Sequence, residues 1–82
     1  QSLELALELS TLGCIHRDLE QWAEALTAYL EAKGIMEDNG WTATEEYGEL
    51  LSSLGRLEMD QKRYEQAMEW YSKSEAVLSN FK

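Results

Sequence analysis

The chain has 82 residues, enough for one small domain or a piece of a larger protein. Hydrophobic residues make up 44% and charged residues 28%, as in folded chains, and no apolar stretch approaches the ~18 residues of a membrane-spanning helix. Sixteen acidic and seven basic residues give a net charge of −9, which disfavours binding to nucleic acid or an anionic membrane and favours basic partners.

Apolar residues recur every three or four positions along most of the chain, the spacing of one helical face. We therefore expect an all-α fold, and the absence of proline leaves long helices uninterrupted. The stretch 3–9 also alternates with the period of a β-strand, but its Leu, Ala and Glu residues favour a helix. The predicted helices cover about residues 2–17, 21–38, 43–59 and 63–80. Their core-facing stripes are predicted to be Leu5, Leu9, Leu12 and His16; Trp22, Ala25, Leu26, Tyr29 and Met36; Tyr47, Leu51 and Leu54; and Tyr64, Ala67, Met68, Tyr71 and Leu78.

Short polar segments separate the four predicted helices. Asn39-Gly40 is typical of a left-handed stop at the end of a helix. The following segment, Thr42 to Glu45, matches a capping box and predicts the start of the third helix. In the other two turns, Asp18 and Asp60 are candidates to cap the second and fourth helices.

The two halves of the chain are similar to each other. A shift of 42 residues places the segment 9–13 (LSTLG) on 51–55 (LSSLG), and the likeness continues through the second half of each unit. The same shift brings together Asp18 and Asp60, Trp22 and Tyr64, Ala25 and Ala67, and Tyr29 and Tyr71. Matches at one offset indicate an internal repeat of two units, about 1–40 and 43–82, within one domain over 1–82.

Each unit resembles a tetratricopeptide repeat, a pair of antiparallel helices that stacks side by side with its neighbours. The resemblance lies in a Leu-Gly pair followed by an aromatic residue and by Ala-x-x-x-Tyr. It implies that the glycines and alanines allow close helix approach while aromatic rings fill the space between turns. The residues expected to pack the repeats are Leu12, Gly13, Trp22, Ala25, Tyr29, Leu54, Gly55, Tyr64, Ala67 and Tyr71. The spacing of 42 exceeds the usual ~34, and the extra residues are expected to lengthen the first helix of the second unit.

The resemblance also implies a function, which is to bind a peptide or a helix of another protein. In this family the first helix of each pair lines a concave groove, and the outward side of these helices carries the candidate contacts. They are Leu3, Leu7, Ser10, Cys14, Arg17, Glu45, Glu49, Ser52, Arg56 and Met59. We expect a protein or peptide partner of basic or apolar character.

An alternative function is self-association. Trp70, Val77 and Phe81 form a second apolar stripe on the last predicted helix, beside its core stripe. A terminal repeat usually has a polar outer face, so this stripe predicts stacking against another repeat or another copy of the chain.

Catalysis and cofactor binding are not expected. Cys14 and His16 are two residues apart, which places them on different faces of a helix and disfavours a nucleophilic pair. His16 stands where the repeat pattern has an aromatic residue, so we expect it in the core. The chain has too few His and Cys residues for a zinc site and no glycine-rich phosphate loop. A single cysteine forms no internal disulfide, which favours a cytoplasmic location.

Overall fold

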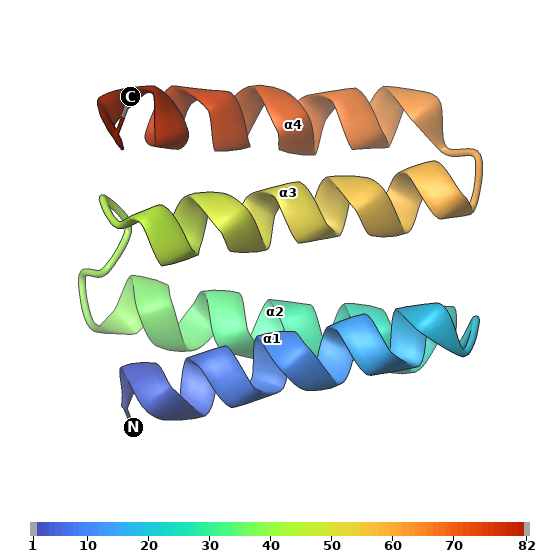
Figure 1. Cartoon of the computed structure of the whole chain (residues 1–82), viewed down its shortest axis with the longest axis horizontal. Coiled ribbons are helices and arrows are strands. Elements are labelled where there is room, and N and C mark those ends of the chain that lie inside the picture. Colours follow the sequence, from blue (N-terminus) through green and yellow to red (C-terminus); the bar gives the residue numbers. More distant parts are fainter. Residues whose placement is uncertain (1, 82) are drawn as a thin grey trace. The chain divides into compact units, whose positions relative to one another are not determined.

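The computed structural model describes residues 2–81, and the regular structure in that range is entirely helical. The all-α prediction is confirmed, and the segment 3–9 with its strand-like alternation lies in the first helix. Helix ends differ from the predicted ones by at most two residues. The elements are α1 (Leu3–Asp18), α2 (Trp22–Asp38), α3 (Glu45–Asp60), α4 (Tyr64–Leu78) and the short 3-10 helix η1 (Ser79–Phe81) (Figure 1).

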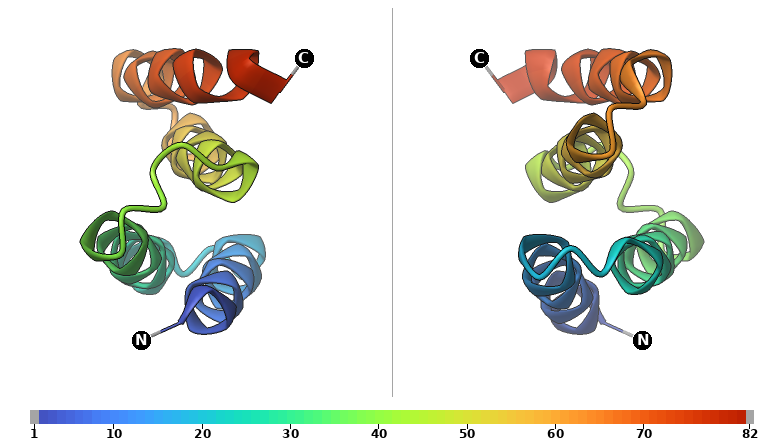
Figure 2. Two further views of the ribbon diagram at one scale, coloured as in Figure 1. Left: turned by 90° about the vertical axis from the view of Figure 1, so that its left-hand side faces the viewer. Right: turned by 90° about the vertical axis from the view of Figure 1, so that its right-hand side faces the viewer.

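The helices form two antiparallel pairs, α1 with α2 and α3 with α4. The end-on views in Figure 2 show the two helices of each pair side by side. The chain divides into two compact units between Trp41 and Thr42, inside the gap between the predicted repeats. The helix pairing within each repeat is therefore present, and the stacking of one pair on the other stays a prediction.

The first helices of the two units have equal lengths. Both α1 and α3 contain 16 residues, and Gly13 and Gly55 occupy the same place in them. The expected lengthening of the third helix alone is therefore wrong. The long repeat spacing arises because every helix is long, 15 to 17 residues, and because six residues connect α2 to α3.

Three of the four helices end in the same hydrogen-bonded turn, with one residue in the left-handed region. These residues are Gly40 (φ 74°), as predicted, and the non-glycine residues Glu20 (φ 60°) and Lys62 (φ 63°). In each turn the next amide donates to a carbonyl five residues back, the bond of a Schellman motif. The donor and acceptor pairs are Gln21 and His16 (2.8 Å), Trp41 and Met36 (2.8 Å), and Arg63 and Glu58 (2.9 Å).

Three predicted helix caps are wrong. Thr44, not Thr42, precedes α3, because Thr44 has an extended backbone and its hydroxyl accepts a 3.1 Å hydrogen bond from the amide of Tyr47. Asp18 and Asp60 are the last residues of α1 and α3, so neither caps the helix that follows. The residues before α2 and α4 are Gln21 and Arg63, whose side chains make no capping hydrogen bond.

Each pair is held closely by a tyrosine ring lying on a glycine. A Cβ atom on Gly13 would stand 2.7 Å from Cδ1 of Tyr29, and one on Gly55 would stand 3.0 Å from Cδ1 of Tyr71. The predicted close approach at these glycines is confirmed, and the atoms that approach are those of a side-chain ring, not of the helix backbone. Ala25 and Ala67, also predicted to pack, are fully buried.

The second unit has a further contact of this kind that the sequence analysis missed. A Cβ atom on Gly48 would meet the side chain of Leu78 at 2.6 Å. Beside it, the buried hydroxyl of Ser74 donates to the carbonyl of Gly48 (2.7 Å) and is hydrogen-bonded to the hydroxyl of Ser52 (2.7 Å). The core of the α3–α4 pair therefore contains a satisfied polar network next to its tightest contact.

Two of the predicted packing residues are exposed. Leu12 is 43% and Tyr64 56% exposed, and Trp22 and Tyr71 are only half-buried, whereas Leu54 is buried. The fully buried residues of α1 are Ala6 and Gly13, each one position after a predicted core leucine. Because one position turns a helix by about 100°, the side of α1 that meets α2 is the small-residue side. The prediction placed the larger side chains inward. Leu5, Leu26 and Met68, which it also placed in the core, are exposed because a neighbouring small residue is buried instead.

We expect Gly13→Ala to destabilise the protein by about 1–3 kcal/mol, because its Cβ would overlap the Tyr29 ring. Gly34 in α2 provides the control, since a Cβ there meets no atom within 4 Å. Gly34→Ala is expected to stabilise the helix by up to about 1 kcal/mol. Urea unfolding measures both values, and equal effects of the two substitutions would contradict the ring contact.

At the left-handed turns, by contrast, we expect an added glycine to stabilise the protein. Glu20→Gly and Lys62→Gly should each stabilise the protein by about 0.5–1 kcal/mol, because glycine adopts a positive φ without the steric cost of a Cβ. Gly40→Ala should destabilise by about 1 kcal/mol through the backbone alone, because no atom lies within 4 Å of the added Cβ. Melting temperatures of the three variants test this, and a loss of stability in both glycine variants would refute it.

Candidate functional site

The predicted groove residues of the first unit share one side of α1, but two of them take part in internal contacts. The sulfur of Cys14 lies 3.1 Å from the hydroxyl of Tyr29, which donates to it. Arg17 is half-buried and forms an ion pair with Asp18 (3.4 Å). Burial opposes the charge of Arg17, yet Tyr29, Cys14 and Asp18 together raise its pKa. Of the other three candidates, Leu7 is exposed and Leu3 and Ser10 are half-buried.

The predicted groove residues of the second unit are more exposed. Glu45, Glu49, Arg56 and Met59 lie on the solvent-facing side of α3. Arg56 forms an i,i+4 ion pair with Asp60 (3.3 Å), and the hydroxyl of Ser52 is bonded to Ser74 in the core network. This side of α3 is a solvated acidic surface, and Ser52 belongs to the packing of the pair.

The predicted stacking stripe on α4 is only partly exposed. Val77 packs toward α3, since its Cγ1 lies 3.3 Å from the position of a Cβ on Gly48. Trp70 is half-buried, with the ammonium of Lys73 4.9 Å from its ring centroid. Phe81 remains 47% exposed. Trp70 and Val77 thus flank the side of α4 that faces α3, Phe81 is the most exposed residue of the stripe, and its role in stacking stays a prediction.

A different apolar surface is exposed on α1. It consists of Leu5 (40% exposed), Leu12 (43%), Ile15 (50%) and Leu19 (63%), and we call it the α1 apolar surface. At 100° per residue the four side chains fall within an arc of about 80°. The corresponding positions of the second unit are buried at Tyr47 (8%), Leu54 (0%) and Leu57 (0%). Three of the four positions are thus apolar in both units, and the fourth, Leu19, corresponds to Gln61.

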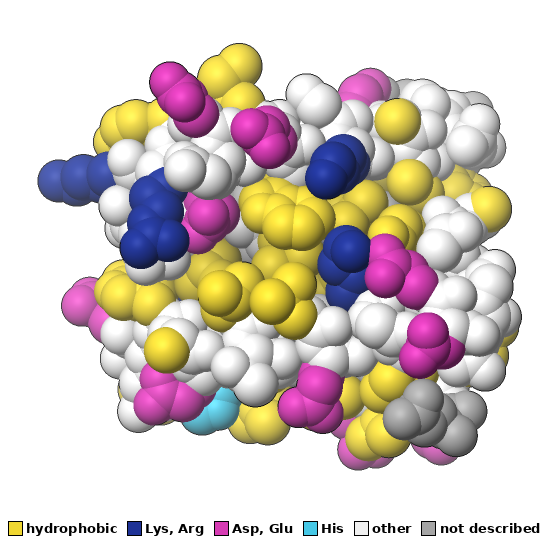
Figure 3. Space-filling model, turned by 180° about the vertical axis from the view of Figure 1, so that it is seen from behind, with side chains coloured by type: hydrophobic (Ala, Val, Ile, Leu, Met, Phe, Trp, Pro, Cys, Tyr) yellow, Lys and Arg dark blue, Asp and Glu magenta, His cyan; other side chains and the backbone are white. Residues whose placement is uncertain are grey.

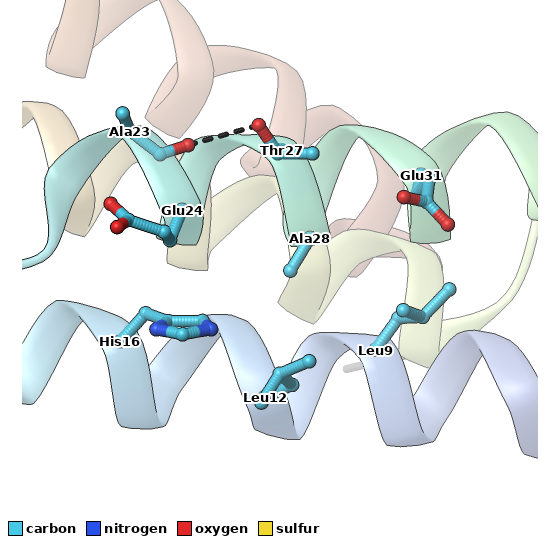
Figure 4. Close-up of a pocket in the computed structure, with 8 residues that line it drawn as sticks. All are labelled: Leu9, Leu12, His16, Ala23, Glu24, Thr27, Ala28 and Glu31. Atoms are coloured by element: carbon cyan, nitrogen blue, oxygen red, sulfur yellow. Dashed lines mark hydrogen bonds between the residues drawn. The ribbon is translucent and has the colours of Figure 1, made fainter.

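An open groove adjoins this surface between α1 and α2. It has a volume of about 350 Å³ and shares Leu12 with the α1 apolar surface. In Figure 4, Ala28 of α2 lies opposite Leu12, Glu24 lies across from His16, and Glu31 lies across from Leu9. We call this feature the α1–α2 groove, lined by Leu9, Leu12, His16, Ala23, Glu24, Thr27, Ala28 and Glu31.

The polar side chains of the α1–α2 groove differ in their availability to a ligand. The hydroxyl of Thr27 donates to the carbonyl of Ala23 (3.0 Å), and Nδ1 of His16 is hydrogen-bonded to Oε1 of Gln21 (2.6 Å). Within residues 2–81, by contrast, no hydrogen bond or ion pair occupies the carboxylate of Glu24 or Glu31. His16 is half-buried rather than a core residue, and Figure 3 shows the histidine side chain, in cyan, at the surface beside acidic and hydrophobic groups.

The described residues give no support to a metal site. No group of three His, Cys, Asp or Glu side chains among residues 2–81 has the geometry to hold a metal ion. In the same range no helix combines the length and the apolar character needed to cross a membrane.

Comparisons with known proteins identify no relative. No protein-family model matches the chain, and no curated protein or solved structure matches it. We therefore infer function from the surfaces of the two helix pairs.

Leu12 and Leu54 occupy equivalent positions and provide a matched test of the exposed surface. Leu54→Ala should cost about 2–5 kcal/mol, because it removes a fully buried side chain. Leu12→Ala should cost less than about 1 kcal/mol, because nearly half of that side chain is already in water. Chemical denaturation of both variants checks this difference, and similar losses would mean that Leu12 is a core residue.

Proposed function

We propose that this chain is a non-enzymatic protein-interaction module built from two tetratricopeptide-like helical hairpins. One observation carries the proposal: Leu5, Leu12, Ile15 and Leu19 place four large apolar side chains, each at least 40% exposed, on one side of α1. Exposed apolar surfaces of this kind mark protein contacts in soluble proteins. Burial of each of the four side chains by a partner would contribute up to roughly 1.5–3 kcal/mol.

The proposed contact and the predicted groove residues lie on different sides of α1. Leu7, an exposed residue of the predicted groove, is separated from Leu12 by about 140° around the helix axis. Cys14 and Arg17 of the predicted groove already have internal partners, whereas Leu12, Ile15 and Leu19 present large apolar side chains to solvent. The α1 apolar surface therefore has more binding area to offer.

The acidic character and the single cysteine support the rest of the proposal. The net charge of −9 favours basic proteins or peptides over nucleic acids and anionic membranes. One cysteine forms no disulfide within the chain, so an oxidising compartment would not stabilise it in that way. We therefore place its function in the cytoplasm.

Self-association is a second candidate function, favoured by a separate observation on α4. Tyr64 (56%), Met68 (66%) and Phe81 (47%) are exposed in the second unit. A chain with apolar side chains exposed in both units has the surfaces needed to assemble with further copies. Sedimentation at increasing concentration distinguishes this role from binding to a different protein.

Selection of peptides from a random display library against the immobilised chain tests the interaction function. Binders should lose at least tenfold in affinity when Leu12 and Ile15 are both changed to Gln, because the apolar contact is removed. Leu7→Gln is the matched control, since Leu7 is similarly exposed on another side of α1 and should leave binding unchanged.

Two outcomes would contradict the proposed contact. The first is a library that yields no binders. The second is a set of binders that respond to Leu7→Gln and ignore the double substitution, because these would occupy the other side of α1.

A further inference from the structure

The α1–α2 groove has the form of a docking site for one side chain of a partner. Its volume of about 350 Å³ is at the lower end of the ~300–1,000 Å³ typical of ligand pockets, and it is open to solvent along its length. The floor is aliphatic, formed by Leu9, Leu12 and Ala28. An open apolar groove between two helices accommodates an anchor side chain of a docked helix better than an enclosed small molecule.

The charge along the groove is of one sign. Glu24 and Glu31 lie two helical turns apart on α2, about 10.5 Å along the axis at 1.5 Å per residue. Residues 2–41 carry eight acidic side chains and two basic ones, Arg17 and Lys33. These two bases already pair with Asp18 (3.4 Å) and Glu37 (2.7 Å). The carboxylates of the groove are therefore available to cations from outside the chain.

The second unit shows that this chemistry is not a necessary part of the repeat. Trp70 stands at the position of Ala28, Gln66 at that of Glu24, and Lys73 at that of Glu31. A large ring thus replaces the methyl group of the groove floor, and a neutral and a basic side chain replace the two carboxylates. The helix pair forms with either set of side chains, so the apolar floor and acidic edge are a feature of the first unit.

We propose that the α1–α2 groove binds a basic amphipathic helix of a partner protein. An apolar side chain of that helix enters the groove over Ala28, and its Lys or Arg side chains pair with Glu24 and Glu31. The remaining apolar face of the partner covers the α1 apolar surface. This inference rests on the proposed interaction function and adds the chemistry of the partner to it.

The test uses a fluorescein-labelled helical peptide of 18 residues made of Leu, Ala and Lys, with leucines on one face and lysines along its edges. Fluorescence anisotropy should show saturable binding to the intact chain that weakens as salt is raised. A peptide with Glu in place of every Lys should bind at least tenfold more weakly. A peptide with Ala in place of every Leu should lose affinity to a similar extent.

Substitutions taken from the second unit provide the matched protein variants. Ala28→Trp fills the groove without a change of charge, and Glu24→Gln with Glu31→Lys removes the acidic edge. Each variant should weaken binding of the Lys peptide at least tenfold. Glu65→Gln with Glu69→Lys makes the same charge change at exposed positions of α4 and should change affinity less than twofold. Circular dichroism confirms folding, and the double Glu variant keeps the test decisive if Ala28→Trp does not fold.

Several results would overturn the inference. Equal weakening by the α4 control would mean that net charge alone attracts the peptide. Binding that ignores both groove variants would place the peptide elsewhere, and a wild-type dimer that excludes the peptide would make a second copy the occupant. If display selects acidic or neutral peptides that still require Leu12 and Ile15, the proposed interaction function stands and the basic partner is wrong.

Discussion

The close contact of a tyrosine ring with a glycine determines how each helix pair is built. The ring of Tyr29 lies so near Gly13 that a single methyl group there would stand 2.7 Å from it, and Tyr71 repeats the arrangement on Gly55. Such a contact requires small residues along the facing side of the helix, and Ala6 is also fully buried in α1. This fixes the rotation of α1 about its own axis, because only one side of α1 has side chains small enough for close approach to α2.

The exposed apolar surface of the first unit lies beside the side of α1 that packs on α2. When the small-residue side of α1 faces its partner, the leucines one position earlier lie at its edge. In the first unit Leu5 and Leu12 are exposed, and Leu12 borders a groove whose floor includes the methyl group of Ala28. The packed side and the exposed apolar side of α1 are thus neighbours on one helix, which connects the fold to the proposed binding function.

The two units show which positions are needed for the fold and which are free to vary. The glycine and tyrosine contacts and the left-handed turns occur in both units, at Glu20 and Lys62 even without glycine. The positions beside them differ in size, as Ala28 and Trp70 do, and in charge, as Glu31 and Lys73 do. Because those differences leave the helix pairing intact, surface chemistry is able to change without loss of the fold.

The sequence by itself determined the number of α-helices, their pairing and two of the contact glycines, Gly13 and Gly55. These follow from local periodicity and from the self-similarity at a shift of 42 residues, and both are visible along a single chain. The left-handed stop at Gly40 also followed from residue type, because glycine alone adopts a positive φ without steric cost.

Only the tertiary structure decided which side of α1 is buried, whereas the predicted core residues Tyr47, Leu51 and Leu54 of α3 are buried. Two stripes are neighbours on α1, one of Leu5, Leu9 and Leu12 and one of Ala6 and Gly13. Hydrophobicity favours burial of the leucine stripe, whereas close approach of α2 favours burial of the small-residue stripe. The choice depends on the ring of Tyr29 from another helix, so no local pattern contains it. The same holds for the α1–α2 groove, since Glu24 and Leu12 come from different helices and meet only after packing.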